Sequence, residues 1–378
     1  MKKALLVSCF GWYQNRLKTV REVLAEEGFE VTVLLSDFLH EVKAPVKVRF
    51  EECTYLHVPP YKKNLSPQRI FSHLVFSGKV KGYIRKAKPD LIYALIPPNR
   101  AASYCASYKK KHPEMIYIND VIDMWPESMP LRGLSNSLPA NVWRNWRTKS
   151  IQAADHVFTE CGLYKDTLAK VTDGSKISPL WLYKERSPQE KEKICKVIAQ
   201  RKPGDEKKVR FAFVGSINYL VDIAGICGVL SRFREEGYET SMQVIGGGER
   251  SEEFLSEVKK TGCEVAFHGK TFDENKKIEI LAPCDYGFNM ILDKLEVGLS
   301  IKSIDYLSMG LPLINSVRGD TARMVRQDRI GVNIDPDGKW MKDIPKVLSH
   351  DRIFDYYESH FSISSFKEQL KAPLEKLL

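Results

Sequence analysis

Residues Val297–Ser316 read VGLSIKSIDYLSMGLPLINS, and this stretch carries the strongest structural signal in the chain. Apolar residues recur at helical spacing from Ile301 to Leu307, and Gly310 ends the helix before a short apolar strand, Leu313–Ile314. A loop, a helix and a strand therefore follow one another. This succession is typical of a doubly wound α/β domain.

Two charged residues stand on the predicted helix. Lys302 and Asp305 are three residues apart, so they share one helix face. A helix that begins after a small-residue loop is a ready anion site, and the lysine adds a point charge for phosphate. The aspartate can accept two ribose hydroxyls. The pattern indicates a nucleoside diphosphate pocket, but an ordinary helix with a surface ion pair fits the same residues.

The chain has 378 residues, which is enough for two domains of ordinary size. It is 43% hydrophobic and 28% charged, as in soluble globular proteins, and no apolar run approaches the roughly 20 residues that span a membrane. The first residues, MKKALLVSCFGW, lead directly into a strand-loop-helix pattern. We interpret them as the first core strand and not as a signal peptide.

Eight cysteines are scattered along the sequence without a Cys-x-x-Cys pair or a histidine at ligand spacing. This argues against a zinc site or a disulfide framework and favours a reducing compartment. We therefore expect a cytoplasmic protein.

The net charge of +10 belongs to the first half of the chain. The segment Tyr61–Lys88 holds eight basic residues and no acidic one, with apolar residues interleaved. This composition predicts a surface for anionic lipid headgroups at the inner face of the membrane. Nucleic acid and a plain solvated helix are the competing interpretations; nucleic acid is not expected, because no recognisable module for it is present.

The first half alternates strands and helices, beginning with the strand Ala4–Ser8, and lacks the Gly-x-Gly-x-x-Gly pattern of a nicotinamide site. A polar stretch follows, and the same alternation restarts at Val209–Gly215. The predicted organisation is a Rossmann-like domain over residues 1–183, a linker over 184–208, a second Rossmann-like domain over 209–345 and a helical tail over 346–378.

Four blocks of the sequence resemble those of GT-B glycosyltransferases, and are similar to family 4, the bacterial polysaccharide and glycoconjugate branch. They occur in the family's order and spacing. The blocks are Asp123–Ser128 (DMWPES), Ala154–Thr159 (ADHVFT), Phe213–Ser216 (FVGS) and Ser300–Pro312, which matches the sugar-nucleotide pattern K-x-x-E/D-Y-x-x-x-G-x-P.

The resemblance implies two Rossmann-like domains facing a cleft, with the donor on the C-terminal domain, the acceptor on the N-terminal one, and a C-terminal helix that crosses back. It implies transfer of a sugar from a nucleotide-diphospho-sugar, with a UDP-sugar favoured, to a glycan or lipid-linked saccharide. Retention at the anomeric carbon, a place in cell-surface polysaccharide or glycoconjugate synthesis, and independence of metal and cofactor are also implied.

The chain departs from family 4 in two places. The family commonly has two glutamates separated by seven residues; here the second position is Asp305, the first falls on Val297, and Glu296 stands one residue early. Either a local shift brings Glu296 into the sugar site, which makes it the candidate sugar contact, or this acid is absent from the chain. The usual arginine and lysine of the first donor-domain loop are absent from Ser216–Asp222.

The resemblance assigns the remaining roles residue by residue. Asp123 is the candidate catalytic base or sugar contact, and Lys302 the group that neutralises the leaving diphosphate. The candidate donor-binding residues are Gly11, Gly215, Ser216, Asn218, Gly247, His268, Gly269, Ser300, Lys302 and Asp305.

Two other functions remain open from the sequence. One is a non-catalytic GT-B subunit that binds a nucleotide-sugar or a partner transferase, which the missing glutamate and the missing basic residues favour. The other is a nucleotide-sugar epimerase of the same two-domain fold.

Overall fold

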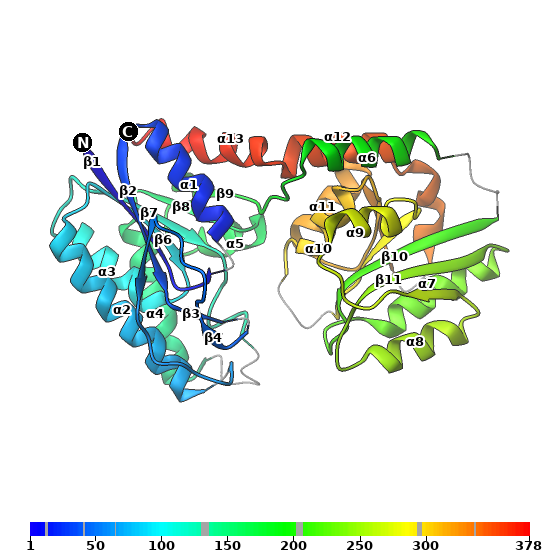
Figure 1. Cartoon of the computed structure of the whole chain (residues 1–378), viewed down its shortest axis with the longest axis horizontal. Helices are drawn as coiled ribbons and strands as arrows, with labels where there is room; N and C mark the ends of the chain where they lie inside the picture. The colour runs from blue at the N-terminus through cyan, green and yellow to red at the C-terminus, as the bar shows by residue number, and fades with distance from the viewer. Residues whose placement is uncertain are drawn as a thin grey trace. The chain divides into compact units, whose positions relative to one another are not determined.

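The computed structural model describes the chain except residues 12–13, 41, 65, 130–135, 202–206, 293–296 and 336–337. The chain forms two compact units (Figure 1). Unit 1 comprises Met1–Trp181 and Lys367–Leu378, and unit 2 comprises Leu182–Phe366. The stretch predicted as a linker, residues 184–208, thus lies in unit 2, where it carries the helix α6 (Pro188–Ala199).

Unit 1 is built on a seven-stranded parallel sheet with the order β5-β2-β1-β6-β7-β8-β9. The central strand β6 is a continuous apolar run, LIYALI, as expected where helices cover both faces of a sheet. Between β1 and β6 the order reverses direction, and ligands of doubly wound sheets bind at such a switch point, outside the carboxyl ends of the strands. The strands are β1 (Lys2–Ser8), β2 (Phe29–Ser36), β5 (Cys53–Leu56), β6 (Leu91–Ile96), β7 (Ile116–Val121), β8 (His156–Thr159) and β9 (Ile177–Pro179).

The helices of unit 1 connect these strands. The longest, α2, begins at Pro67 with Ser66 as its N-cap and ends before Lys88, which has a left-handed backbone. A short antiparallel pair, β3 (Phe38–Leu39) and β4 (Ala44–Pro45), lies outside the main sheet. The helices are α1 (Gln14–Glu26), α2 (Pro67–Ala87), α3 (Asn99–Lys109), α4 (Leu138–Ala153) and α5 (Gly162–Leu168), with the short 3₁₀ helix η3 (Gly174–Lys176).

Unit 2 repeats the same architecture with a six-stranded parallel sheet in the order β12-β11-β10-β13-β14-β15. Its switch point lies between β10 and β13. The strands are β10 (Lys208–Ser216), β11 (Glu239–Gly247), β12 (Glu264–Phe267), β13 (Tyr286–Asn289), β14 (Leu313–Asn315) and β15 (Gly331–Asn333).

The described residues of unit 2 also form the helices that follow α6. Its core is rich in aromatic rings: Phe211 of β10 stacks on Phe288 of β13 with their ring centroids 4.9 Å apart. The elements are α7 (Ile223–Glu235), α8 (Ser251–Lys260), α9 (Glu274–Leu281), α10 (Ile301–Leu307), α11 (Gly319–Asp328), η4 (Lys339–Lys346) and α12 (His350–Phe361).

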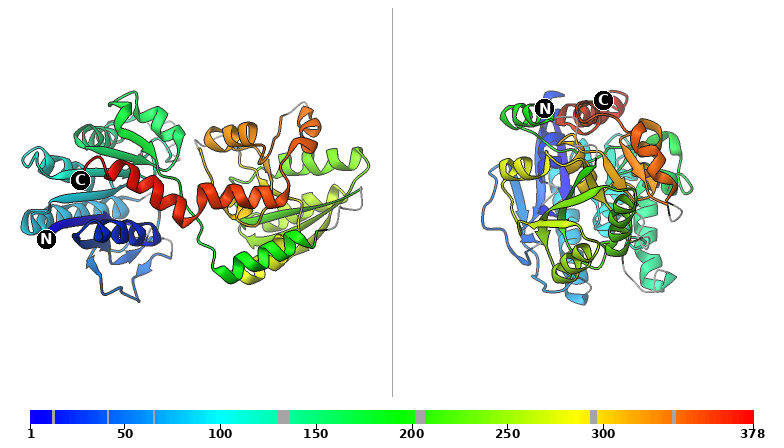
Figure 2. Two further views of the ribbon diagram at one scale, coloured as in Figure 1. Left: turned by 90° about the horizontal axis from the view of Figure 1, so that it is seen from above. Right: turned by 90° about the vertical axis from the view of Figure 1, so that its right-hand side faces the viewer.

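The last helix, α13 (Ile363–Leu374), begins in unit 2 and ends in unit 1, where it lies beside α1 (Figure 2). Lys367 is 3.1 Å from Glu22, and Lys371 is 2.8 Å from Glu26. The two Rossmann-like units and the returning helix confirm the predicted fold class. Among the described residues, no helix combines the length and the apolar character needed to cross a membrane.

Candidate functional site

One side chain bridges the two strands that flank the switch point of unit 2. The Tyr306 hydroxyl accepts a hydrogen bond from the amide of Val214 on β10 at 2.9 Å and donates one to the carbonyl of Phe288 on β13 at 3.2 Å. Gly287 permits this, because a Cβ atom there would overlap the tyrosine ring. Tyr306 therefore fixes α10, which carries Lys302, against both strands.

Lys302 lies against the bare backbone of Gly215. A Cβ atom at Gly215 would be 2.8 Å from the Cε of the lysine, and Gly215 has a φ of +116°. The Nζ is 4.5 Å from the ring centroid of Phe213. Within the described part of the chain the ammonium has no hydrogen bond or ion pair. Burial lowers the pKa of Lys302 to about 8, so the site holds an uncompensated cation.

Glycines shape the loops that follow β10, β11 and β12. Ile217 donates its amide proton to Gly247 at 3.2 Å, and Gly246 donates to Gly269 at 2.8 Å. A Cβ atom at Gly246 would overlap the carbonyl oxygen of Gly215, so the loops approach as closely as glycine allows. Gly215, Gly247 and Gly269 thus lie together at the carboxyl edge of the sheet.

Ser300 is the N-cap of α10, and its hydroxyl is already engaged. It accepts a hydrogen bond from the Ser303 amide at 3.1 Å and lies 2.6 Å from Oδ1 of Asn289. Asn289 donates in turn to Asn315 at 2.8 Å, and Asn315 donates to Asn333 at 2.7 Å. This ladder crosses β13, β14 and β15, and it positions the start of α10. Since the single hydroxyl proton of Ser300 goes to Asn289, a phosphate would have to displace that bond.

Asp305 lies one turn after Lys302 and contacts a different lysine. Its Oδ1 is 3.0 Å from the Nζ of Lys184, which is also 2.9 Å from Glu274. Lys184 was not predicted, because nothing in the polar stretch around it distinguishes it from its neighbours.

Other predicted donor residues also lie at this edge of unit 2, and their side chains make few hydrogen bonds. Ser216 is exposed at the end of β10. Asn218 accepts a hydrogen bond from Leu220 at 3.0 Å and so closes its own turn. The His268 Nε2 is 2.7 Å from Gln243. Glu296, the candidate sugar contact, lies outside the described residues.

The switch point of unit 1 holds the block Asp123–Ser128 and Gly11, which follows β1. Asp123 follows β7; its Oδ2 accepts from the Trp125 indole at 2.7 Å and its Oδ1 from the Ser128 hydroxyl. Burial raises the pKa of Asp123, although these bonds and Arg69 oppose the shift. The carboxylate is oriented by its own block and retains lone pairs for a ligand.

An aromatic cluster supports this block. His73 stacks on Trp125 at 5.7 Å with an interplanar angle of 16°, and the Arg69 guanidinium is 4.5 Å from the Trp125 ring. His73 is 7% exposed, and its Nε2 has no protein partner among the described residues. Burial, with Arg69 second, lowers the pKa of His73 to about 3, so the ring is neutral.

Two further carboxylates of unit 1 have distinct roles. Glu127 receives hydrogen bonds from Arg147 at 2.6 and 3.0 Å and from Arg144 at 2.8 Å, so it holds α4 against the block. Glu160 follows β8 and was not among the predicted site residues. Burial raises its pKa to about 8, with Asp123 adding to the shift and Arg16 opposing it.

Among the described residues no three His, Cys, Asp or Glu side chains are grouped to hold a metal ion.

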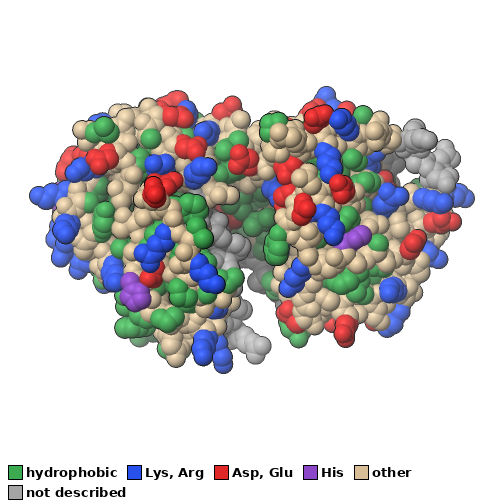
Figure 3. Space-filling model, viewed as in Figure 1, with side chains coloured by type: hydrophobic (Ala, Val, Ile, Leu, Met, Phe, Trp, Pro, Cys, Tyr) green, Lys and Arg blue, Asp and Glu red, His purple; other side chains and the backbone are tan. Residues whose placement is uncertain are grey.

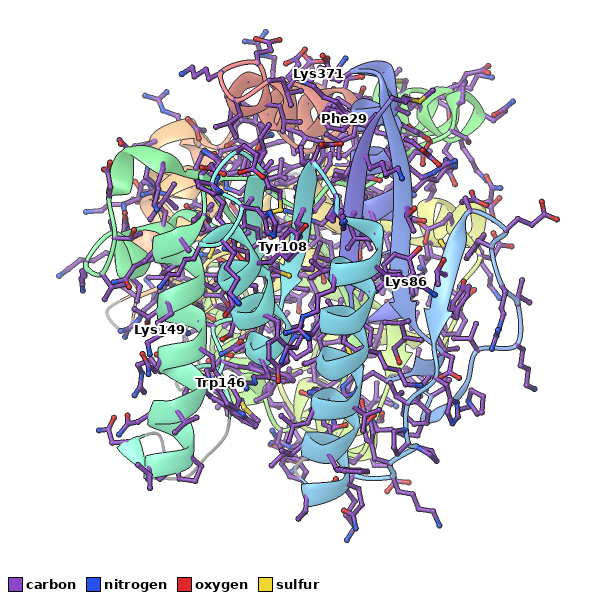
Figure 4. All side chains as sticks on the ribbon, turned by 90° about the vertical axis from the view of Figure 1, so that its left-hand side faces the viewer. Phe29, Lys86, Tyr108, Trp146, Lys149 and Lys371 are labelled. Atoms are coloured by element: carbon purple, nitrogen blue, oxygen red, sulfur yellow. The ribbon has the colours of Figure 1, made fainter. Side chains whose placement is uncertain are left out.

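The segment predicted to contact lipid forms α2 and the loop before it. Figure 4 looks onto α2, α3 and α4, with Lys86 on α2 and Trp146 and Lys149 on α4. Three apolar side chains near the start of α2 are exposed, Ile70 at 42%, Phe71 at 59% and Leu74 at 42%. The exposed face of α2 therefore has an apolar beginning and a basic end.

No protein-family model matches the chain, and no curated protein matches it. Solved structures do. Sucrose-phosphate synthase from Thermosynechococcus elongatus is 12% identical with a TM-score of 0.68, and the match covers 100% of this chain and 99% of that one. The lipopolysaccharide outer core galactosyltransferase WaaB is 15% identical with a TM-score of 0.63, covering 100% of both chains.

A third solved structure broadens the comparison. It is a putative UDP-N-acetylglucosamine 2-epimerase from Listeria monocytogenes, 11% identical with a TM-score of 0.55, and the match covers 100% of this chain and 96% of that one. Identities this low show a shared architecture and leave the reaction open. The chain has the GT-B fold, which glycosyltransferases and this epimerase share.

Proposed function

We propose that this protein is a glycosyltransferase that moves a sugar from a nucleotide-diphospho-sugar, a UDP-sugar in the first instance, to a hydroxyl of a glycan or lipid-linked saccharide. One observation carries the proposal: Lys302, an uncompensated and largely desolvated cation, lies at the switch point of unit 2 against glycine backbone. A diphosphate would supply the negative charge that compensates the Lys302 ammonium. The GT-B fold and the four sequence blocks support the same assignment.

In the proposed reaction Lys302 neutralises the negative charge that develops on the leaving diphosphate. A fixed cation in a partly buried site is effective because little reorganisation is needed as the charge grows. The loops around Gly215 and Gly247 bring backbone close to the phosphates, and Asp305 accepts the ribose hydroxyls. We propose transfer with retention and without a metal or cofactor, as the resemblance implies, so no protein nucleophile is required.

On the acceptor side, Asp123 is the proposed base or sugar contact. Its carboxylate is fixed by Trp125 and Ser128 at the carboxyl edge of unit 1. A base whose pKa is raised by burial accepts a proton more readily than an exposed aspartate does. We propose that the acceptor belongs to cell-surface polysaccharide or glycoconjugate synthesis.

The Tyr61–Lys88 segment is proposed to hold a cytoplasmic protein at an anionic membrane surface. Lys62, Lys63, Lys79, Arg85, Lys86 and Lys88 are exposed. Figure 3 shows basic side chains over both units, several of them at the left-hand margin of unit 1. Exposed apolar side chains beside cations fit the interface between headgroups and acyl chains.

Vesicle sedimentation tests the membrane proposal. A variant with Lys79, Arg85 and Lys86 changed to Glu should lose binding to vesicles containing phosphatidylglycerol, while its affinity for nucleotides is unchanged. A matched variant with the exposed residues Lys110, Lys111 and Lys170 changed to Glu removes the same charge elsewhere in unit 1. Unchanged binding of the first variant, or equal loss in both, would exclude a specific surface on α2.

The donor site is tested by a thermal-shift screen against UDP, GDP, CMP and ADP and their common sugars. A ligand at 100 times its dissociation constant stabilises the fold by about 2.7 kcal/mol. One diphosphate should shift the wild type, and Lys302→Ala should reduce the shift. If none of these ligands shifts the melting temperature, the donor site and the proposed function are both contradicted.

Product analysis then separates the transferase from the two other functions. A transferase releases a nucleoside diphosphate when an acceptor is present. An epimerase converts the sugar of the sugar nucleotide with no acceptor present and releases no nucleoside diphosphate. This alternative is tested because the chain shares its fold with an epimerase. A non-catalytic subunit binds the donor and yields neither product.

A further inference from the structure

Lys184 places its ammonium between two carboxylates of unit 2. Its Nζ is 3.0 Å from Oδ1 of Asp305 and 2.9 Å from Oε2 of Glu274. The side chains of Lys184 and Asp305 are only 24% and 21% exposed, so solvent screens this pair less than a surface ion pair. With two anions beside it, Lys184 carries no spare charge for a diphosphate, unlike Lys302.

The backbone of Lys184 is fixed where it meets α12. Its amide donates to the carbonyl of Phe361 at 3.0 Å, and its own carbonyl accepts from the Tyr357 hydroxyl at 2.6 Å. Lys184 is the third residue of unit 2. Because its backbone is held by these two hydrogen bonds, its ammonium has a defined position.

Glu274 holds the ammonium from the other side. Arg186, whose side chain is 1% exposed, donates to Glu274 at 2.7 Å, and Lys277 donates at 2.7 Å. Burial alone would raise the pKa of Glu274, but Lys277, Lys184 and Arg186 lower it to about 2. Glu274 is therefore ionised at neutral pH and anchors Lys184.

We propose that Lys184 is a positioning residue for the ribose of the donor, acting through Asp305; this rests on the donor site proposed above. Lys184 holds Oδ1 of Asp305, whereas Oδ2 has no protein partner among the described residues. A carboxylate accepts about four hydrogen bonds, so the oriented group can take two ribose hydroxyls as well. Without the lysine, Asp305 rotates freely and must be ordered when the ribose binds.

The experiment measures dissociation constants by calorimetry for whichever of UDP, GDP and ADP binds most tightly, and for its 2′,3′-dideoxy analogue. Lys184→Met should weaken binding of the ribonucleotide about tenfold, which corresponds to 1.4 kcal/mol. It should change binding of the dideoxy analogue less than about twofold, because Asp305 then has no hydroxyl to accept. Lys184→Arg should restore most of the affinity.

Two controls keep the result interpretable. Lys193→Met removes a more exposed pair of the same kind, with Glu279 at 2.6 Å between α6 and α9, and should leave both dissociation constants unchanged. In an Asp305→Asn background, Lys184→Met should have no further effect. Melting temperatures of all variants report any loss of folding.

The outcomes separate this inference from the proposed function. Equal weakening of both ligands by Lys184→Met, or no weakening of either, would overturn the role of Lys184. If Lys302→Ala still reduces binding in those cases, the donor site stands. If no diphosphate binds the wild-type protein, the donor site falls and the role of Lys184 falls with it.

Discussion

The hydroxyl oxygen of Tyr306 accepts a hydrogen bond from the backbone amide of Val214 at 2.9 Å. The described pairing of β10 with β13 covers Phe211 and Ala212 and ends before Val214, so on this side a side chain satisfies the amide of Val214. The same hydroxyl donates to Phe288 on β13. One tyrosine thus stabilises the opening in which the proposed donor site lies.

Tyr306→Phe should destabilise unit 2 by about 1–3 kcal/mol, because it leaves the buried Val214 amide and Phe288 carbonyl without their partner. Urea unfolding measures the change. Tyr219→Phe removes a hydroxyl from a ring that is 69% exposed and should change the free energy of unfolding by less than about 0.5 kcal/mol. Equal effects of the two substitutions would contradict the bridging role.

Gly215→Ala should weaken binding of the nucleoside diphosphate at least tenfold, because the new methyl group meets the Lys302 stem and φ is +116°. Gly228→Ala is the matched control: it is exposed in α7, has open space around its Cα, and should stabilise the helix by about 0.5–1 kcal/mol. Calorimetry for the first and thermal melting for both measure these changes. Unchanged affinity for the nucleoside diphosphate in Gly215→Ala would show that Gly215 is not part of the donor site.

The buried amine of Lys302 should make stability depend on pH. Its pKa is lowered from 10.5 to about 8 by burial, so between these values the unfolded chain binds more protons than the folded one. Stability therefore rises with pH through this window, by on the order of 3 kcal/mol at most. Lys302→Met should remove the rise. The free energy of unfolding of the wild type minus that of the variant, measured by urea unfolding from pH 7 to pH 10, should rise; a constant difference would show that the amine is solvated or paired.

The strand and helix pattern of both units could be predicted from the sequence, because it depends on local periodicity. The helix Ser251–Lys260 is an example: acidic residues stand in its first turn and basic residues in its last, which complements the helix dipole. The helix α6 lies in the polar stretch 184–208, where apolar periodicity gives little information. A local signal for it exists, since Ser187 and Glu190 form a capping box.

The candidate site was predictable only in part. Lys302 and Asp305 stand out because both belong to one helix and their spacing is local. The bond from Tyr306 to Val214 joins residues 92 positions apart, and Lys184 lies far from Asp305 in sequence, so only the fold brings these groups together. The Ser300 hydroxyl, predicted to bind phosphate, donates instead to the side chain of Asn289 on β13. Sequence periodicity does not reveal such a contact.

Asp123→Asn should separate the chemistry from the binding of the donor. If Asp123 is the base, the substitution lowers the transfer rate about 100-fold or more, while the dissociation constant of the nucleoside diphosphate stays within twofold. The wild-type rate should fall as the pH decreases through the raised pKa of Asp123, because protonation removes the base. Rates under saturating donor, together with donor calorimetry, measure both quantities.

Glu127→Gln is the control that distinguishes catalysis from the architecture of the block. Glu127 lies four residues after Asp123 and pairs with Arg147 and Arg144, so its substitution should lower the melting temperature, because it weakens the hold on α4. Asp123→Asn keeps the shape of the side chain and one acceptor oxygen, so its melting temperature should fall less. If Asp123→Asn instead melts like Glu127→Gln and both lose transfer in proportion to folded protein, Asp123 serves only to cap the turn that holds Trp125.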